Sequence, residues 1–249
     1  MAEYVVIDKE QLESDLTIVA DSIRAKANVT EKLEFPLGMK SAVEAIQSGG
    51  GESFNPLDYA SFGSNGWIFY GVTFPEDTKL KFTLHNQWPV LSNQFSYCKN
   101  LKECEFDITK ITSINLTNVF MESRQLTKVK FVGQDVVKIS GMNQAFSECT
   151  SLETIEGCLG FSNNNVIMNN TYYNAKKLKD ITFDMGCIYR SVSFAQSPLL
   201  TDVSIQSIID GLADLTGSTA QTLTLHADVK AKLTETQIAT ITGKNWTLA

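Results

Sequence analysis

The stretch AFSECTSLETIEG, residues 145–157, contains a spacing of residue types that recurs along the chain. After its aromatic residue come a small residue at +3, a Leu at +6 and an apolar residue at +9. The same offsets, with a further apolar residue at +11, occur in four other stretches, so that the five copies begin at Phe95, Phe120, Phe146, Tyr172 and Phe194. Their starts lie 25, 26, 26 and 22 residues apart, and only the third copy departs at +11, where Gly157 stands. Shared internal spacing in five copies predicts a repeat architecture.

Each copy predicts one turn followed by one strand. The aromatic residue and the small +3 residue fall on one side of a single helical or 3₁₀ turn. Positions +9 and +11 alternate as in a strand, with both side chains pointing inward. A unit this short cannot close a core, so the units should stack and pair their strands along the stack. We therefore expect the recurring aromatic, Leu and Cys residues to be scaffold.

The segments around the repeats predict terminal caps. Residues 57–92 are β-rich and should form an N-terminal cap, 93–205 hold the repeats, and 206–249 should form a C-terminal cap. In the C-terminal region we expect an amphipathic helix over 205–215, a strand at TLTLH, a capping box of Thr234 with Gln237, Gly243 just past the last helix and a final strand at NWTLA. A second strand per unit is expected over 111–116, 136–139 and 166–168.

The first 47 residues predict a separate helical hairpin with one apolar side. Asp8 and Gln11 match a capping box, and residues 48–56 form a Gly-rich linker. The apolar residues expected to mediate oligomerisation or docking are Leu12, Leu16, Val19, Ile23, Met39, Val43 and Ile46. An alternative is that this side folds back on the rest of the chain. The fold class is then α+β: an N-terminal helical hairpin, a β-rich leucine-rich-repeat solenoid and a helix-containing C-terminal cap.

Composition argues against several classes of function. The net charge is −7 and the isoelectric point is about 4.9, so the surface should repel nucleic acid and anionic membranes. We expect no secretory signal and no membrane insertion, because neither a signal-peptide pattern nor a long apolar run occurs. The five Cys have no paired spacing, which favours buried free thiols over disulfides or zinc.

We identify no catalytic residue, metal ligand or cofactor site in the sequence. His85 and His226 each follow Thr-Leu and read as strand-end residues, and no nucleotide-binding or hydrolase motif appears. Binding is the more plausible activity, because exposed aromatic rings stack on sugars and anchor protein interfaces. The candidate ligand-binding residues are Trp67, Tyr70, Trp88, Tyr172, Tyr173, Asn163 and Asn169. An alternative for each aromatic residue is a place in the core, and for each Asn a role in a turn.

The repeat resembles the BspA-like class of bacterial leucine-rich repeats, with its AF-x-x-C-x-x-L-x-x-I element, over roughly residues 90–205. That resemblance implies a solenoid and a surface-interaction role. The stretch LTIVADSIRAKANVTEKLEFPLGMKSAVEAI is similar to the N-terminal module of phage and prophage tail or baseplate-associated proteins of Gram-positive bacteria, although Ser22 and Asn28-Val29 depart from that pattern. Residues 205–249 are also similar to the ends of such tail proteins.

These resemblances imply a non-enzymatic virion component, assembled in the bacterial cytoplasm into a phage tail. Its expected partners are other tail or baseplate proteins, further copies of itself in a trimer, and a glycan or protein on the host cell surface. One alternative is a bacterial cell-surface adhesin with the same repeats. Another is a tail-associated enzyme that cleaves glycans, which would need two suitably spaced carboxylates.

Overall fold

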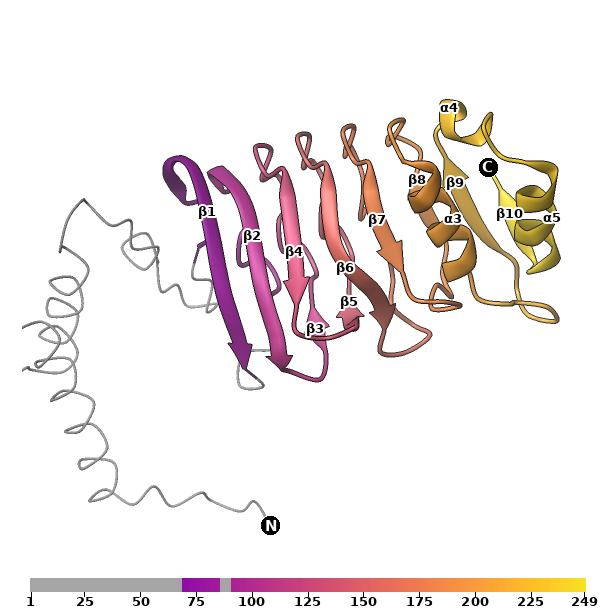
Figure 1. Ribbon diagram of the computed structural model, residues 1–249, viewed down its shortest axis with the longest axis horizontal. Coiled ribbons are helices and arrows are strands. Elements are labelled where there is room, and N and C mark those ends of the chain that lie inside the picture. Colours follow the sequence, from indigo (N-terminus) through magenta and orange to yellow (C-terminus); the bar gives the residue numbers. More distant parts are fainter. Residues whose placement is uncertain (1–68, 86–90) are drawn as a thin grey trace, which may run out of the picture. The chain divides into compact units, whose positions relative to one another are not determined.

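The computed structural model describes residues 69–85 and 91–249, and these form a stack of parallel strands followed by a mixed C-terminal region (Figure 1). The N-terminal hairpin, the linker, Trp67 and Trp88 lie outside these residues. The strands of the main sheet are β1 (Thr73–His85), β2 (Lys99–Lys110), β3 (Ile114–Asn115), β4 (Lys128–Val132), β5 (Val136–Gly141), β6 (Thr154–Phe161) and β7 (Asp180–Phe183). The remaining elements are β8 (Val192–Phe194), α3 (Asp202–Gly211), β9 (Gln221–Leu225), α4 (Ala227–Lys230), α5 (Glu235–Gly243) and β10 (Trp246–Leu248).

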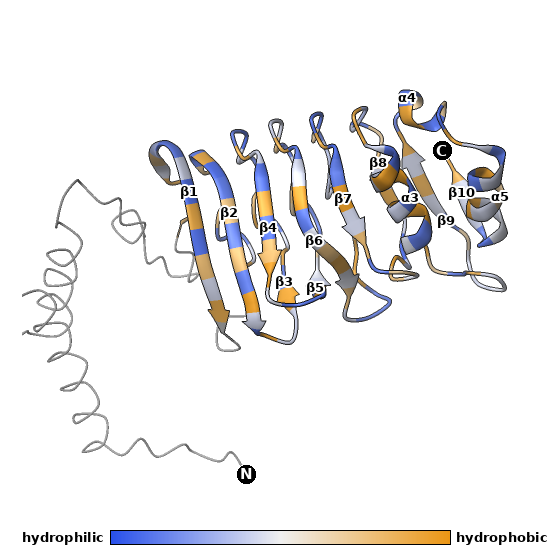
Figure 2. Ribbon diagram, in the orientation of Figure 1, coloured by the Kyte–Doolittle hydropathy of each residue, from blue (hydrophilic) through white to orange (hydrophobic). Residues whose placement is uncertain are grey.

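The repeats align in register in a parallel sheet. The +9 residues Cys104, Val129 and Ile155 are direct partners in β2, β4 and β6, and each is buried. Figure 2 shows the accompanying alternation of polar and apolar residues along these strands. The prediction of inward-facing strands is confirmed for the first four copies. It is wrong for the fifth, because Val203 and Ile205 lie in α3; Ile205 belongs to the helical spacing of Ile205, Ile208 and Ile209, which are buried.

The aromatic residues of the repeats form one continuous ladder of stacked rings. Neighbouring centroids are 5.2 to 6.1 Å apart along the first five rings and 4.5 Å apart at the last pair, with interplanar angles of at most 20°. Its rungs are Phe69, Phe95, Phe120, Phe146, Tyr172 and Phe194. Phe69 precedes the first copy recognised in the sequence, so the ladder starts one unit earlier than predicted.

The turns that carry these rings are not the helical or 3₁₀ turns that the spacing predicted. In the first four copies the turn contains two non-glycine residues with positive φ, one two positions before the aromatic ring and one two positions after it. They are Asn93, Tyr97, Asn118, Glu122, Gln144, Glu148, Asn170 and Asn174, with φ between 52° and 63°. The left-handed conformation costs free energy for such residues. It also directs N–H groups along the stack, and Phe95 and Tyr97 donate to Val119 and Met121 of the next unit.

The small +3 residues do more than leave room for the neighbouring turn. The Cys98 thiol donates to the Phe69 carbonyl at 2.9 Å, the Ser123 hydroxyl to the Phe95 carbonyl at 2.5 Å and the Cys149 thiol to the Phe120 carbonyl at 3.0 Å. In the first three copies the +3 side chain thus connects its unit to the aromatic residue of the unit before, and Cys and Ser both serve there because both are small donors. In the last two copies the pattern changes, since Ala175 has no side-chain donor and the Ser197 hydroxyl donates to the Ala175 carbonyl.

Gly157 is required where the third copy departs from the pattern. Its φ is +113°, and a Cβ there would lie 3.1 Å from the Phe131 Cβ. The residue divides β6 into two halves, of which the first pairs with β4 and the second with β5. An extra pair of short strands, β5 with β3, is thereby joined to the main sheet. The second strand predicted over 136–139 is present within β5, the one predicted over 111–116 is present only at Ile114–Asn115, and 166–168 is not a strand.

At its C-terminal end the stack is closed by a helix in place of a strand. The Ile181 and Phe183 amides of β7 donate to the Ser204 and Ser207 hydroxyls of α3, at 3.0 and 2.9 Å. Those hydroxyls accept from backbone N–H groups at the edge of the sheet, which would otherwise need a further strand as their hydrogen-bond partner. A second parallel sheet, in the order β10-β9-β8, follows.

The predicted features of the C-terminal region are largely present. The helix near 205–215, the TLTLH strand, the final strand and the capping box of Thr234 with Gln237 are confirmed. Gly243 is the last residue of α5 and not the residue beyond it. The left-handed residue after this helix is Asn245, whose φ is 62°.

Candidate functional site

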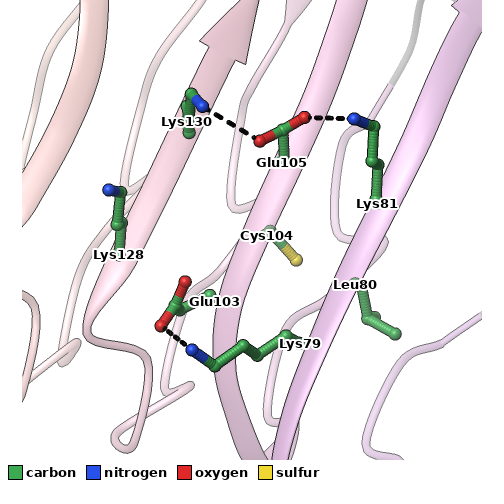
Figure 3. A pocket seen from close by; sticks show the side chains of 8 residues that line it. All are labelled: Lys79, Leu80, Lys81, Glu103, Cys104, Glu105, Lys128 and Lys130. Carbon is green, nitrogen blue, oxygen red and sulfur yellow. Dashed lines mark ion pairs between the residues drawn. The ribbon is translucent and has the colours of Figure 1, made fainter.

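The outer face of the main sheet carries charged residues that neutralise one another. Lys79 contacts Glu103 at 2.6 Å, and Glu105 lies between Lys81 at 2.7 Å and Lys130 at 3.2 Å (Figure 3). Lys128 pairs with Glu156 on the next strand. The flanking lysines hold the pKa of Glu105 below its usual range. A hollow of about 320 Å³ lies over these side chains. Because its cations already have carboxylate partners, this face is poorly suited to recruit a charged ligand.

A second surface follows the turns along one side of the stack. We call it the turn edge and define it by its outward side chains: Tyr70, Tyr97, Glu122, Arg124, Glu148, Thr150, Tyr173, Asn174 and Gln196. Backbone hydrogen bonds connect consecutive units along this edge. The amide of Tyr97 donates to the Met121 carbonyl, that of Glu122 to Ser147 and that of Glu148 to Tyr173, at 2.7 to 2.8 Å. A rigid backbone therefore holds this row of side chains.

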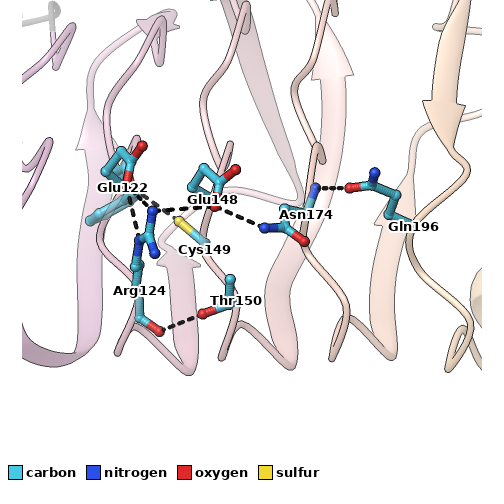
Figure 4. A network of polar contacts seen from close by, with 8 residues as sticks. Glu122, Arg124, Glu148, Cys149, Thr150, Asn174 and Gln196 are labelled. Atoms are coloured by element: carbon cyan, nitrogen blue, oxygen red, sulfur yellow. Dashed lines mark hydrogen bonds and ion pairs between the residues drawn. The ribbon is translucent and has the colours of Figure 1, made fainter.

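Polar side chains in the middle of the turn edge form a network (Figure 4). The Arg124 guanidinium donates to one Glu122 oxygen at 2.7 and 3.0 Å and lies 3.6 Å from Glu148. The Asn174 side chain donates to Glu148 at 2.8 Å, and its backbone N–H donates to the Gln196 side chain at 2.6 Å. These contacts span the second to the fifth repeat and fix the orientation of donors and acceptors that reach solvent.

Tyrosines flank this network. Tyr70 and Tyr97 meet edge to face, with ring centroids 5.3 Å apart, and both are about two-fifths exposed. Tyr173 is 48% exposed and lies three units further along the stack. Three strand spacings correspond to about 14 Å. The turn edge thus offers aromatic surface on either side of the Glu122–Arg124–Glu148 group, a combination that suits recognition of a sugar chain or a polar peptide.

The structure distributes the predicted ligand-binding residues unevenly. Tyr70 and Tyr173 lie on the turn edge. The prediction for Tyr172 is corrected: its side chain is 1% exposed because its ring is a rung of the ladder. Asn163 and Asn169 are exposed. Asn163 accepts from the Asn165 amide in a local turn, and Asn169 begins the turn that carries Tyr173 and accepts from the Gln144 amide through its carbonyl. The remaining predicted residues lie outside the described part: Trp67, Trp88 and the docking residues Leu12, Leu16, Val19, Ile23, Met39, Val43 and Ile46.

Sequence reasoning missed the polar half of the turn edge. Glu122, Glu148 and Asn174 all occupy the +2 position of their repeats, and Tyr97 is the corresponding residue of the first copy. A column of outward side chains at one repeat position was the available signal. It was overlooked because the apolar positions alone define the repeat.

The cysteine thiols are poorly suited to nucleophilic chemistry. Burial raises the pKa of Cys98 to about 12 and raises those of Cys104 and Cys149 well above the usual thiol range. The thiolate is the reactive form, so such groups are inert. No group of three or more His, Cys, Asp or Glu residues within 69–85 and 91–249 is arranged to hold a metal ion. Over the same residues, none of the helices has the length and hydropathy required of a membrane-spanning segment.

Stacked units, a parallel sheet and an inward aromatic ladder define a leucine-rich-repeat solenoid. The family described as BspA type leucine-rich repeat region matches residues 89–216 in six copies, and the chain belongs to this family. No curated protein and no solved structure gave a significant match. The family is thus established from the repeats.

Proposed function

We propose that this chain is a recognition protein whose turn edge binds a glycan on a bacterial cell surface. The observation that carries the proposal is the row formed by Tyr97, the Glu122–Arg124–Glu148 group and Tyr173. Aromatic faces stack on the apolar faces of sugar rings, while carboxylates and amides accept and donate hydrogen bonds to hydroxyl groups. The rigid backbone beneath them limits the conformational entropy lost on binding.

We further propose that the protein is a distal component of a phage tail, with residues 1–47 attaching it to other tail or baseplate proteins and assembling it as a trimer. The pattern within residues 16–46 favours this location. The repeat family fits a bacterial surface adhesin equally well. Immunogold labelling of intact phage particles and of uninfected cells would distinguish the two: label confined to cells would overturn the tail assignment. A monomer in light scattering of the full chain at micromolar concentration would overturn the trimer.

We propose a binding role in preference to cleavage of the glycan. A glycosidase pairs one protonated carboxyl group with one carboxylate across the bond to be cleaved. On the turn edge, Glu122 and Glu148 both face the Arg124 guanidinium, on an open surface. Release of reducing ends from purified wall polysaccharide by the wild-type protein, lost in a Glu148→Gln variant, would establish the enzymatic alternative.

The binding proposal is tested with immobilised wall polysaccharides from Gram-positive bacteria and the labelled full chain. We expect the double variant Tyr97→Ala, Tyr173→Ala to bind at least tenfold more weakly than the wild type. Lys79→Ala, on the sheet face, is the matched control and should bind like the wild type. Equal binding by the wild type and the double variant, or equal losses in the double variant and the control, would refute the turn edge as the binding surface.

A further inference from the structure

The strongest feature outside the turn edge is a groove between β7 and α3. It has a volume of about 650 Å³, and its lining residues are Cys158, Phe183, Asp184, Met185, Asp202, Val203, Gln206, Ser207 and Asp210. Met185 is 81% exposed and Val203 is 76% exposed. Of the large apolar side chains that the structure describes as exposed, these two are the most exposed. They lie together in one groove, whereas scattered exposed apolar residues need no explanation.

The groove exists because a helix replaces a strand at this point of the stack (Figure 1). Val203 occupies the +9 position of the fifth repeat, and the +9 residues of the four preceding repeats are all buried. In α3 the side chain at this position turns outward, next to the segment that follows β7. The departure from the repeat therefore creates an apolar surface that no other unit contains.

Carboxylates surround this apolar surface. Asp184, Asp202 and Asp210 line the groove, and no ion pair joins any of them to a cation of the described part of the chain. Asp184 accepts from the Met185 amide, and Asp210 from the Gln206 side chain. On the sheet face, by contrast, the acidic side chains are paired with lysines. The groove is thus a localised site of negative charge with an apolar floor.

These features restrict what can occupy the groove. The three carboxylates do not converge as metal ligands. A second copy of this chain is disfavoured because its net charge of −7 would add like charge to an acidic groove. A positively charged partner that also carries apolar side chains would pair with the carboxylates and pack against the apolar side chains of the groove.

We propose that the groove docks a basic segment of a partner protein, in which apolar side chains alternate with Lys or Arg. The apolar side chains contact Met185 and Val203, and the cations face Asp184, Asp202 and Asp210. This surface is separate from the turn edge, so the inference does not rest on glycan recognition. It gives the protein a protein-binding end in addition to its proposed glycan-binding edge.

The test uses the full chain and fluorescein-labelled peptides in anisotropy titrations near physiological salt. The probe is KVKLKVK, the charge control is KSKSKSK, and the apolar control is EVELEVE. We expect the probe to bind at least tenfold more tightly than either control. Met185→Ser with Val203→Ser should abolish this preference, and both substitutions lie at exposed positions that should not affect folding. Leu199→Ser, at an exposed apolar residue outside the groove, is the matched control and should retain it.

Three results would overturn the proposal. The first is equal binding of KVKLKVK and KSKSKSK to the wild type, which would indicate nonspecific attraction. The second is unchanged binding by the Met185→Ser, Val203→Ser variant. The third is a lack of protection of Cys158, which lines the groove. A saturating concentration of the probe should slow the alkylation of Cys158 by iodoacetamide at least threefold and leave that of Cys187 unchanged, as resolved by mass spectrometry. An unchanged rate at Cys158 would place the peptide elsewhere.

Discussion

Replacing Ser123 with Ala tests the idea that +3 side chains connect neighbouring repeats. Ser123 is fully buried. Its hydroxyl donates to the Phe95 carbonyl at 2.5 Å and accepts from the Cys98 amide at 3.1 Å. The variant loses both contacts and keeps the aromatic ladder intact. It therefore isolates the hydrogen bonds from the packing of the rings.

The structure allows the size of the effect to be worked out. Ser123→Ala leaves one buried carbonyl and one buried N–H without this partner, and each costs about 1–3 kcal/mol. The smaller desolvation penalty of Ala offsets part of that sum, so we expect a loss of about 2–4 kcal/mol. In a folded unit of this size, 1 kcal/mol corresponds to about 2–4 °C in Tm. The expected decrease is roughly 4–16 °C.

Urea unfolding followed by far-UV circular dichroism and by tryptophan fluorescence measures this loss. Coincident transitions would support two-state analysis, which repeat proteins do not always satisfy. Ser123→Cys is the matched control, because Cys98 and Cys149 donate to the equivalent carbonyls. We expect it to lose less than about 1 kcal/mol, since a thiol keeps a weaker form of both contacts. The reasoning is refuted if the free energy of unfolding of Ser123→Ala lies within about 0.5 kcal/mol of that of the wild type, which is roughly the error of such measurements. It is also refuted if Ser123→Cys loses as much stability as Ser123→Ala.

Three further predictions concern other groups. Tyr172→Phe should leave the free energy of unfolding unchanged or raise it by about 1 kcal/mol, because the buried hydroxyl has no hydrogen-bond partner among the described residues; a loss above that size in urea unfolding would show that the hydroxyl is bonded. At about pH 8, Ellman's reagent should modify no thiols of the native protein other than the partly buried Cys158 and Cys187, and all five after unfolding in guanidinium; rapid modification of a third thiol in the native state would contradict the burial. Lysines lower the pKa of Glu105 in the folded state, so its stabilisation is present above the unfolded pKa of about 4.3 and is lost as pH falls through the folded pKa. The urea midpoint of Glu105→Gln should therefore lie below that of the wild type at neutral pH, and the difference should shrink as the pH falls below about 4.3; a difference that stays the same at neutral and acidic pH would be inconsistent with this origin.

The repeat architecture was predictable because burial imposes one residue type at each offset. Aromatic residues at 0 and Leu at +6 recur wherever a unit contacts its neighbours on both sides, and the ladder from Phe95 to Phe194 follows directly. The left-handed residues were harder to predict. Asn at 93, 118, 170 and 174 is typical of positive φ, but Tyr97, Glu122, Gln144 and Glu148 adopt it only because cross-unit hydrogen bonds compensate the cost.

The two candidate surfaces were predictable only in part. The sequence predicts Tyr70, Tyr172 and Tyr173 alike as ligand-binding candidates. Tyr70 and Tyr173 are exposed, whereas Tyr172, one position before Tyr173 in the same turn, is buried. Side-chain direction at adjacent residues depends on the local backbone, which composition does not reveal. The groove at Met185 and Val203 could not be predicted, since Val203 fits the repeat pattern and is exposed only because that segment is helical.

The helix that closes the stack also determines where the protein can grow during evolution. Ser204 and Ser207 occupy the terminal strand edge, so a duplicated unit added after β7 would separate the helix from its binding site. A unit duplicated between two internal repeats would meet the same neighbours on both sides and leave both ends as they are. Gene duplication can therefore lengthen the turn edge by whole units, while the groove between β7 and α3 remains single.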